Sequence, residues 1–183
     1  MRLFGRPPEL PAAHAVYTAL VAAARAPVFY ARHGVPDTLD GRFEMIALHV
    51  FLVLHRVKGA PEGQRFGQVL YDVMFADMDR ALREMGTGDL SVGKQVKRMA
   101  SGLAGRITTY QAGLEGTADL AEALRRNLYG TVTEPGEADL AVLAAYVRAQ
   151  AAALAGQPVE QIVAGTVSFA SPPLDSARSA PEI

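Results

Sequence analysis

The sequence lacks cysteine, which excludes disulfide bonds, thiolate nucleophiles and thiolate metal ligands. It also lacks a strong charge of either sign, since its formal net charge is −1. A charged partner must therefore be bound by a local patch. No uninterrupted apolar run reaches the roughly 20 residues that cross a bilayer. The N-terminal MRLFGRPPELP is broken by Pro7 and Pro8, unlike a secretory signal. We expect a cytoplasmic protein, with peripheral contact at the inner membrane left open.

One stretch is expected to lie at the centre of the fold. It is Arg42–Val57, RFEMIALHVFLVLHRV, in which Met45 to Leu54 is apolar except for His49. A helix with apolar side chains on every side must be surrounded by other elements. A strand is the alternative for so short a run. Residues that can cap and end a helix favour the helix: Asp37 or Asp40 before it, and Gly59 and Pro61 after it.

The predicted fold class is all-α, a single globular multi-helix bundle around this buried central helix. The 183 residues, half of them hydrophobic, suit one domain with a core. This helical domain spans 11–165, between an N-terminal arm at 1–10 and a flexible tail at 166–183 without periodicity. Ser91 and Thr117 are expected to cap two of the helices. The expected helices span 11–26, 42–57, 66–85, 92–114, 118–129 and 137–155, with short helical turns at 28–33 and 158–164 and a loop at 59–65.

Charged residues gather on two consecutive predicted helices. Asp77, Arg80 and Glu84 line one side of the 66–85 helix, and Asp79 and Arg83 form a second pair at a spacing of four. The 92–114 helix begins with the basic residues Lys94, Lys97 and Arg98. These residues could contact DNA, anionic lipid or an acidic partner surface. The alternative for them is an ordinary solvated helix face.

No catalytic or metal-binding constellation is predicted. The spacing GxxxxGK at Gly88–Lys94 matches a phosphate loop, but a helix precedes it where a strand is required, so a connection between helices is favoured. His49 and His55 do not share a helix face, and no Glu-x-x-His pair occurs. His49 is interpreted as a hydrogen-bonded core histidine. Asp77 is interpreted as part of a local network with Arg80.

Two longer motifs in a fixed order carry a resemblance to a known family. They are GVPDTLDGRFEMIALH at Gly34–His49 and FADMDRALREMGTGDLSVGKQVKRMASGLAGR at Phe75–Arg106, followed by Tyr110. Over about Tyr17–Leu114 the sequence resembles the ubiquinol–cytochrome c chaperone family. Leu103-Ala104 departs from the aromatic pair expected there. The family-like positions are Asp37, Arg42, Phe43, His49, Asp77, Asp79, Arg80, Arg83, Glu84, Gly86, Asp89, Lys94, Lys97, Met99, Gly105, Arg106 and Tyr110.

The resemblance implies a non-enzymatic, all-helical assembly chaperone for the cytochrome bc1 complex, without a cofactor. Its implied partners are newly made cytochrome b or another bc1 subunit, with a small co-chaperone, and no nucleic acid. The alternatives are a helical binder of an apolar small molecule such as a quinone or lipid, with His49 and Asp77 converging on a cavity, and a helical DNA-binding regulator. The residues predicted to form the partner-binding surface are Asp77, Asp79, Arg80, Arg83, Lys94, Lys97, Arg98 and Arg106.

Overall fold

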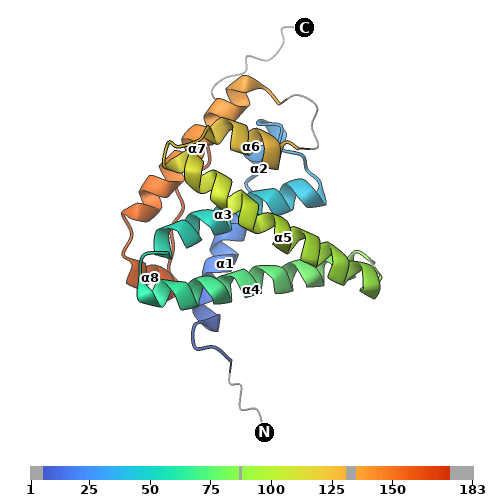
Figure 1. Cartoon of the computed structure of the whole chain (residues 1–183), viewed down its shortest axis with the longest axis vertical. Helices are drawn as coiled ribbons and strands as arrows, with labels where there is room; N and C mark the ends of the chain where they lie inside the picture. The colour runs from blue at the N-terminus through green and yellow to red at the C-terminus, as the bar shows by residue number, and fades with distance from the viewer. Residues whose placement is uncertain (1–5, 87, 131–134, 174–183) are drawn as a thin grey trace.

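The computed structural model describes residues 6–86, 88–130 and 135–173. Within these ranges the chain forms helices and no strand, so the predicted all-α fold is confirmed (Figure 1). The helices, in chain order, are α1 (Leu10–Ala24), α2 (Pro27–Ala31), α3 (Leu39–Val57), α4 (Pro61–Glu84), α5 (Asp89–Leu114), α6 (Leu120–Leu128), α7 (Glu137–Ala155) and α8 (Val159–Val163).

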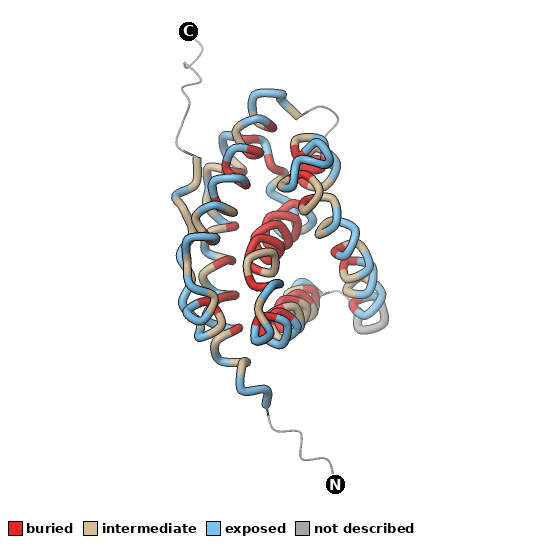
Figure 2. The backbone as a smooth tube through the Cα atoms, turned by 60° about the vertical axis from the view of Figure 1, so that its left-hand side comes forward, coloured by how far each residue is buried: buried red, intermediate tan, exposed pale blue. Residues whose placement is uncertain are grey.

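Helix α3 is the element around which the others pack, as the sequence predicted. Its residues are buried without interruption from Phe43 to Val53. Helices α1, α4, α5, α6, α7 and α8 all contact it, and Figure 2 shows it as a buried coil among partly exposed helices. Each large apolar side chain enclosed in this way contributes about 1.5–3 kcal/mol relative to exposure. The burial of α3 is therefore the main driving force for the arrangement of the bundle.

The start of α3 is determined by a cap and a close approach of the chain. Thr38 is the N-cap, and its Oγ1 accepts a hydrogen bond from the backbone N–H of Gly41 at 3.2 Å. Asp37 and Asp40, the predicted caps, do not take this role. Asp37 instead pairs with Arg42 at 2.6 Å. A Cβ on Gly41 would overlap the carbonyl oxygen of the preceding loop, so glycine is needed where the chain turns into the helix.

The positions of the other helices follow the sequence pattern closely. Helix α7 has the predicted bounds, and α1, α2 and α8 differ from the prediction by no more than two residues at either end. Helix α4 begins at Pro61 instead of Phe66, so most of the predicted loop at 59–65 is helical. Proline suits the first turn of a helix because the missing N–H would be unpaired there. The residues that looked like a loop are therefore the first turn of α4.

Two other predicted caps are wrong. Helix α5 begins at Asp89 behind Gly88, ahead of the predicted cap Ser91, and no side chain caps it. Helix α6 is capped by Asp119, whose carboxylate accepts a hydrogen bond from the N–H of Ala121 at 2.9 Å. The predicted cap, Thr117, donates its hydroxyl hydrogen bond to a backbone carbonyl of α5 at 3.2 Å instead. Which of several neighbouring polar residues caps a helix depends on where the preceding turn ends.

His49 is a buried histidine in the middle of α3, and the prediction of a hydrogen-bonded core histidine is confirmed. Its Nδ1 lies 2.8 Å from the carbonyl oxygen of Met45, so the proton must be on this nitrogen. Its Nε2 accepts a hydrogen bond from the Tyr146 hydroxyl of α7 at 2.8 Å. The rings of Phe29 and Phe169 pack around it. Burial lowers the pKa of His49 to about 4, so the imidazole is neutral in this core.

The segment after α8 contacts α7 and its C-terminal end as far as Ala170, beyond the predicted domain boundary at residue 165. The side-chain amide of Gln150 both donates to and accepts from the backbone of Ala170, at 2.7 and 2.9 Å. Gln157 makes the same pair of bonds with Ser168, at 2.8 and 2.9 Å. Between them, Phe169 packs its ring against His49. These contacts hold the first part of the stretch predicted as a flexible tail, and residues 174–183 lie outside the described residues.

An ion pair joins α5 to α3. The guanidinium of Arg106 makes two hydrogen bonds to the carboxylate of Glu44, one of them at 2.6 Å through Nε. Only 8% of the Glu44 side chain and 23% of the Arg106 side chain are exposed. Gly102, one turn before Arg106, leaves the space through which the guanidinium lies, because a Cβ there would overlap Nη1. Glycine on α5 therefore permits the contact with α3.

The far end of the α4–α5 hairpin extends beyond the rest of the bundle (Figure 1). Met85, at the end of α4, is 56% exposed and is the one large apolar side chain among the described residues that is exposed to this degree. Lys94, Lys97 and Arg98 of α5 are also exposed. This hairpin therefore offers solvent both an apolar side chain and a run of basic ones.

Two helical stretches, Leu10–Ala31 and Glu137–Ala155, are long and apolar enough to cross a membrane by length and composition alone. This differs from the expectation drawn from uninterrupted apolar runs, because alanine-rich helices reach the threshold without such a run. Core helices meet the same criteria. In this structure α1 and α7 both pack against α3 and bury one face each.

Replacing His49 by glutamine is expected to reduce the pH dependence of folding stability. The unfolded chain protonates this histidine near its ordinary pKa of 6.5, whereas the folded protein does so only near 4. Acidification between these values therefore stabilises the unfolded state alone, and the free energy of unfolding falls by about 3 kcal/mol. Urea unfolding at several pH values would measure this loss. The exposed His14→Gln variant should keep the wild-type dependence, and parallel curves for wild type and His49→Gln would contradict the prediction.

Alanine substitutions at two glycines of α5 should have opposite effects. Gly105→Ala is expected to stabilise the protein by about 1 kcal/mol through helix propensity, because a Cβ there meets no neighbouring atom. Gly102→Ala should lose this gain and destabilise the fold, because its Cβ displaces Arg106 from the buried carboxylate of Glu44. Thermal unfolding of both variants tests this contrast, and equal stabilisation by both would show that the ion pair is dispensable.

Candidate partner-binding site

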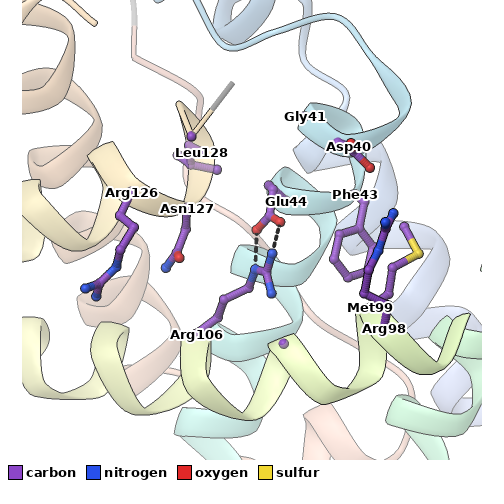
Figure 3. A pocket seen from close by; sticks show the side chains of 12 residues that line it. Asp40, Gly41, Phe43, Glu44, Arg98, Met99, Arg106, Arg126, Asn127 and Leu128 are labelled. Carbon is purple, nitrogen blue, oxygen red and sulfur yellow. Dashed lines mark hydrogen bonds and ion pairs between the residues drawn. The ribbon is translucent and has the colours of Figure 1, made fainter. Parts of the chain in front are cut away.

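A hollow of about 430 Å³ lies where α3, α5 and α6 meet, and it contains the Glu44–Arg106 pair (Figure 3). Helix α3 contributes Glu44 and Phe43 from its first turns, next to the close approach at Gly41. Helix α5 crosses this end of α3 and contributes Arg106 together with Arg98, which lies two turns earlier. The C-terminal end of α6 closes the third side. The hollow is therefore formed by residues that are far apart in the sequence.

The electrostatics of the hollow are dominated by a buried carboxylate. Burial raises the pKa of Glu44, and the hydrogen bonds and charge of Arg106 oppose the rise. Burial also acts to lower the pKa of Arg106, but the bonds and charge of Glu44 outweigh it and raise this pKa. A two-bond contact of this kind is strong because both partners are charged. Arg106 is thus held in the wall of the hollow and is not available as a free surface charge.

Two further arginines line the hollow without such a partner. Arg98 of α5 and Arg126 of α6 are exposed, and in the view of Figure 3 they lie on either side of the Glu44–Arg106 pair. Within the described residues, neither makes a hydrogen bond or an ion pair. Asp40 of α3 is the second acidic group of the lining. Among the described residues of the lining, three guanidinium groups and two carboxylates leave one excess positive charge.

Apolar side chains form much of the rest of the lining. Phe43, Met99 and Leu128 are buried beneath its surface. The guanidinium carbon of Arg106 lies 5.8 Å from the centre of the Phe43 ring, within the range of a cation–π contact. One turn further along α5, Tyr110 is fully buried, and burial raises the pKa of its hydroxyl. The hollow therefore combines an apolar floor with charged edges.

The predicted residues Asp77 and Arg80 lie elsewhere, in a separate groove of about 620 Å³ between α1 and α4. The Tyr17 hydroxyl of α1 donates a hydrogen bond to Asp77 Oδ2 at 2.9 Å, and Arg80 pairs with the other oxygen. Burial and the nearby Asp77 raise the pKa of Tyr17, so the hydroxyl keeps the proton that it donates. The interpretation of Asp77 as part of a local network with Arg80 is confirmed.

The other predicted surface residues fall into two groups. Asp79 and Arg83 pair with each other on α4 at 2.6 Å, and this charge-assisted bond lowers the pKa of Asp79. Lys94 and Lys97 are exposed on α5, on the same helix as Arg98. The eight predicted residues thus do not meet in one place. Arg98 and Arg106 line the hollow, while the remaining residues lie along the α4–α5 hairpin and its groove with α1.

Sequence reasoning missed three residues that complete the hollow: Glu44, Arg126 and Asn127. One signal could have pointed to Glu44, since it is the acid that directly precedes the apolar run of the central helix. An acid so close to a buried stretch needs a cationic partner. Nothing in the sequence indicates that this partner lies 62 positions later, at Arg106.

The arrangement keeps the two residues of the small-molecule alternative apart. His49 and Asp77 are held in separate networks, by Tyr146 of α7 and Tyr17 of α1, so they do not converge on one cavity as the small-molecule alternative requires. Among the residues that the structure describes, no cluster of three metal-ligating side chains occurs. The hollow presents the paired guanidinium group of Arg106 and the unpaired ones of Arg98 and Arg126 above an apolar floor. This arrangement suits recognition of a polar or charged segment of another molecule.

Comparison with known proteins agrees with this picture. Residues 31–169 match the family model described as ubiquinol-cytochrome C chaperone. The chain is 29% identical over 141 residues to ubiquinol-cytochrome c reductase complex assembly factor 1 of Mus musculus, a match that takes in 76% of this chain and 48% of that protein. The chain thus spans about half the length of the curated relative that it matches.

The fold has also been seen in a solved structure. The crystal structure of the Cbp3 homolog from Brucella abortus is similar with a TM-score of 0.77 and 39% sequence identity, over 88% of this chain and 90% of that chain. The family match includes α3 to α8, the hollow among α3, α5 and α6, and the packed segment up to Phe169. The chain belongs to the ubiquinol-cytochrome c chaperone family.

Proposed function

We propose that this protein is a non-enzymatic assembly chaperone for the cytochrome bc1 complex. The observation that carries the proposal is the family match over residues 31–169, which spans every helix from α3 onward. The name of the mouse relative refers to assembly of the same complex. The site chemistry is consistent with this role, because charged and apolar groups line hollows that are open to solvent.

The client in this proposal is newly made cytochrome b or another bc1 subunit, with which a small co-chaperone acts. The protein works in the cytoplasm, in peripheral contact with the inner membrane where such a client inserts. A membrane subunit has polar loops and ends that remain outside the bilayer. A helical surface with exposed charges can bind these loops before the subunit is assembled, while the chaperone's own apolar residues stay in its core.

The binding surface in this proposal includes the basic face of α5. Lys94, Lys97 and Arg98 are exposed, and within the described residues none of them is tied up in an ion pair. They continue from the hollow toward the tip of the α4–α5 hairpin, where Met85 is exposed. The paired residues Asp77, Asp79, Arg80 and Arg83 of α4 also belong to the proposed surface, with Asp77 and Arg80 in the groove with α1.

Deleting the gene should lower the level of assembled bc1 complex and of cytochrome b. The expected cause is that the unassembled subunit is degraded when no chaperone protects it. Difference spectra of membranes and native gels of the bc1 complex measure the two quantities. A plasmid copy of the wild-type gene should restore both. Normal cytochrome b and bc1 levels in the deletion strain would overturn the proposal.

Reversing the three basic charges of α5 should weaken client capture without unfolding the protein. The variant Lys94→Glu, Lys97→Glu, Arg98→Glu changes exposed side chains, so its thermal stability should stay close to wild type. Its yield of cytochrome b in pull-downs from solubilised membranes should fall by about ten-fold or more. Arg148→Glu, at an exposed position on α7, is the matched control and should capture normally. Equal capture by both variants would exclude this face from the binding surface.

A further inference from the structure

We propose that the hollow between α3, α5 and α6 binds the carboxylate side chains of an acidic segment in a protein partner. This inference rests on the proposed function and names the chemistry of the partner. Its direct ligands are Arg98 and Arg126, which reach the hollow from two different helices. The Glu44–Arg106 pair forms the wall between them (Figure 3).

The excess positive charge of the hollow is the first reason to expect that it binds a carboxylate. Arg106 is neutralised by two hydrogen bonds to Glu44, whereas Arg98 and Arg126 have no hydrogen-bonded or ionic partner in the part of the chain that the structure describes. Guanidinium groups bind carboxylates through two parallel N–H donors. The hollow already holds one such contact at Glu44, and the two free arginines can make the same contact with a carboxylate supplied from outside.

The remaining acid of the lining argues for a carboxylate over a phosphate. Asp40 lies at the edge of the hollow with no ion pair to another described residue. The described residues of the lining carry one excess positive charge, and this matches a single carboxylate. A phosphate group with up to two negative charges would be repelled by Asp40 and by the buried Glu44. Asp40 therefore acts against multiply charged anions.

The shape and the floor of the hollow argue for a peptide over a membrane surface. A concave space of about 430 Å³ can receive one or two side chains, but the headgroups of a flat bilayer cannot enter it. Phe43, Met99 and Leu128 are buried beneath the arginines, so among the described residues the rim presents no large apolar side chain for insertion into lipid. An extended peptide segment can instead place an acidic side chain above this floor, next to the arginines.

The test uses a labelled peptide of alternating glutamate and leucine and its counterpart with glutamine in place of glutamate. Fluorescence anisotropy with the full-length protein should show binding of the glutamate peptide. The affinity for the glutamine peptide should be lower by about ten-fold or more. The double variant Arg98→Glu, Arg126→Glu should lose the difference between the two peptides. Arg148→Glu, on the exposed face of α7, should retain it.

The Asp40→Asn variant should change the affinity for the glutamate peptide in the opposite direction, so it distinguishes an effect on recognition from an effect on folding. Removing this negative charge should tighten binding of the glutamate peptide several-fold, which a general loss of structure cannot do. Inorganic phosphate should compete no better than acetate, and vesicles of phosphatidylglycerol and phosphatidylcholine should not bind the protein through these two arginines.

Equal binding of both peptides would overturn the inference, and so would retention of the peptide difference by the Arg98→Glu, Arg126→Glu variant. Binding to anionic vesicles that depends on Arg98 and Arg126, without binding of the glutamate peptide, would overturn it as well. The proposed function is tested separately by bc1 levels in the deletion strain. A double variant that restores those levels in full would refute the carboxylate site and leave the chaperone role intact.

Discussion

The enclosure of α3 on every side is the constraint from which the rest of the structure follows. The helix is buried from Phe43 to Val53, so a polar group on it has little access to water and must be paired by another protein group. Glu44 and His49 are the two such groups within this stretch. Leaving either one unpaired would cost several kcal/mol. The apolar residues supply the stability of the core, and these two polar residues restrict how it can be packed.

Three polar residues of α3 bond to α5 and to α7. Glu44 pairs with Arg106 and so determines where α5 crosses the first turns of α3. His49 bonds to Tyr146 and positions the middle of α7. Arg56 donates to the carbonyl oxygens of Leu154 and Gln157, at 2.9 and 2.7 Å, and ties the last turn of α3 to the end of α7. Apolar contacts tolerate sliding of helices past one another, but the hydrogen bonds of Glu44, His49 and Arg56 do not. We regard these hydrogen bonds as the reason that α5 and α7 pack against α3 in a single register.

The sequence was sufficient for the helices and insufficient for the site, and the reason is physical. A helix is encoded locally, by apolar spacing and by residues that start or end it, although Pro61, predicted to end α3, starts α4. Most predicted helices therefore match the structure. The hollow depends on the packing of α5 and α6 against α3, which brings Arg126 near Glu44. Distances between such positions depend on crossing angles that periodicity does not contain. The charged residues were recognisable, but the way that they divide into two separate hollows was not.

The state of pairing decides which charged residues can contribute to binding. On α4, Asp77 pairs with Arg80 and Asp79 with Arg83, so a partner that used these residues would first have to break contacts that already exist. On α5 and α6, Arg98 and Arg126 have no such contacts among the described residues, and a partner carboxylate would add a bond without removing one. The exposed, unpaired side chains keep their hydration and rotamer freedom until a partner binds. The free-energy cost of losing both on binding is modest for a surface arginine. In the proposed complex, binding energy would therefore be gained at Arg98 and Arg126, while the paired charges of α4 keep their existing contacts.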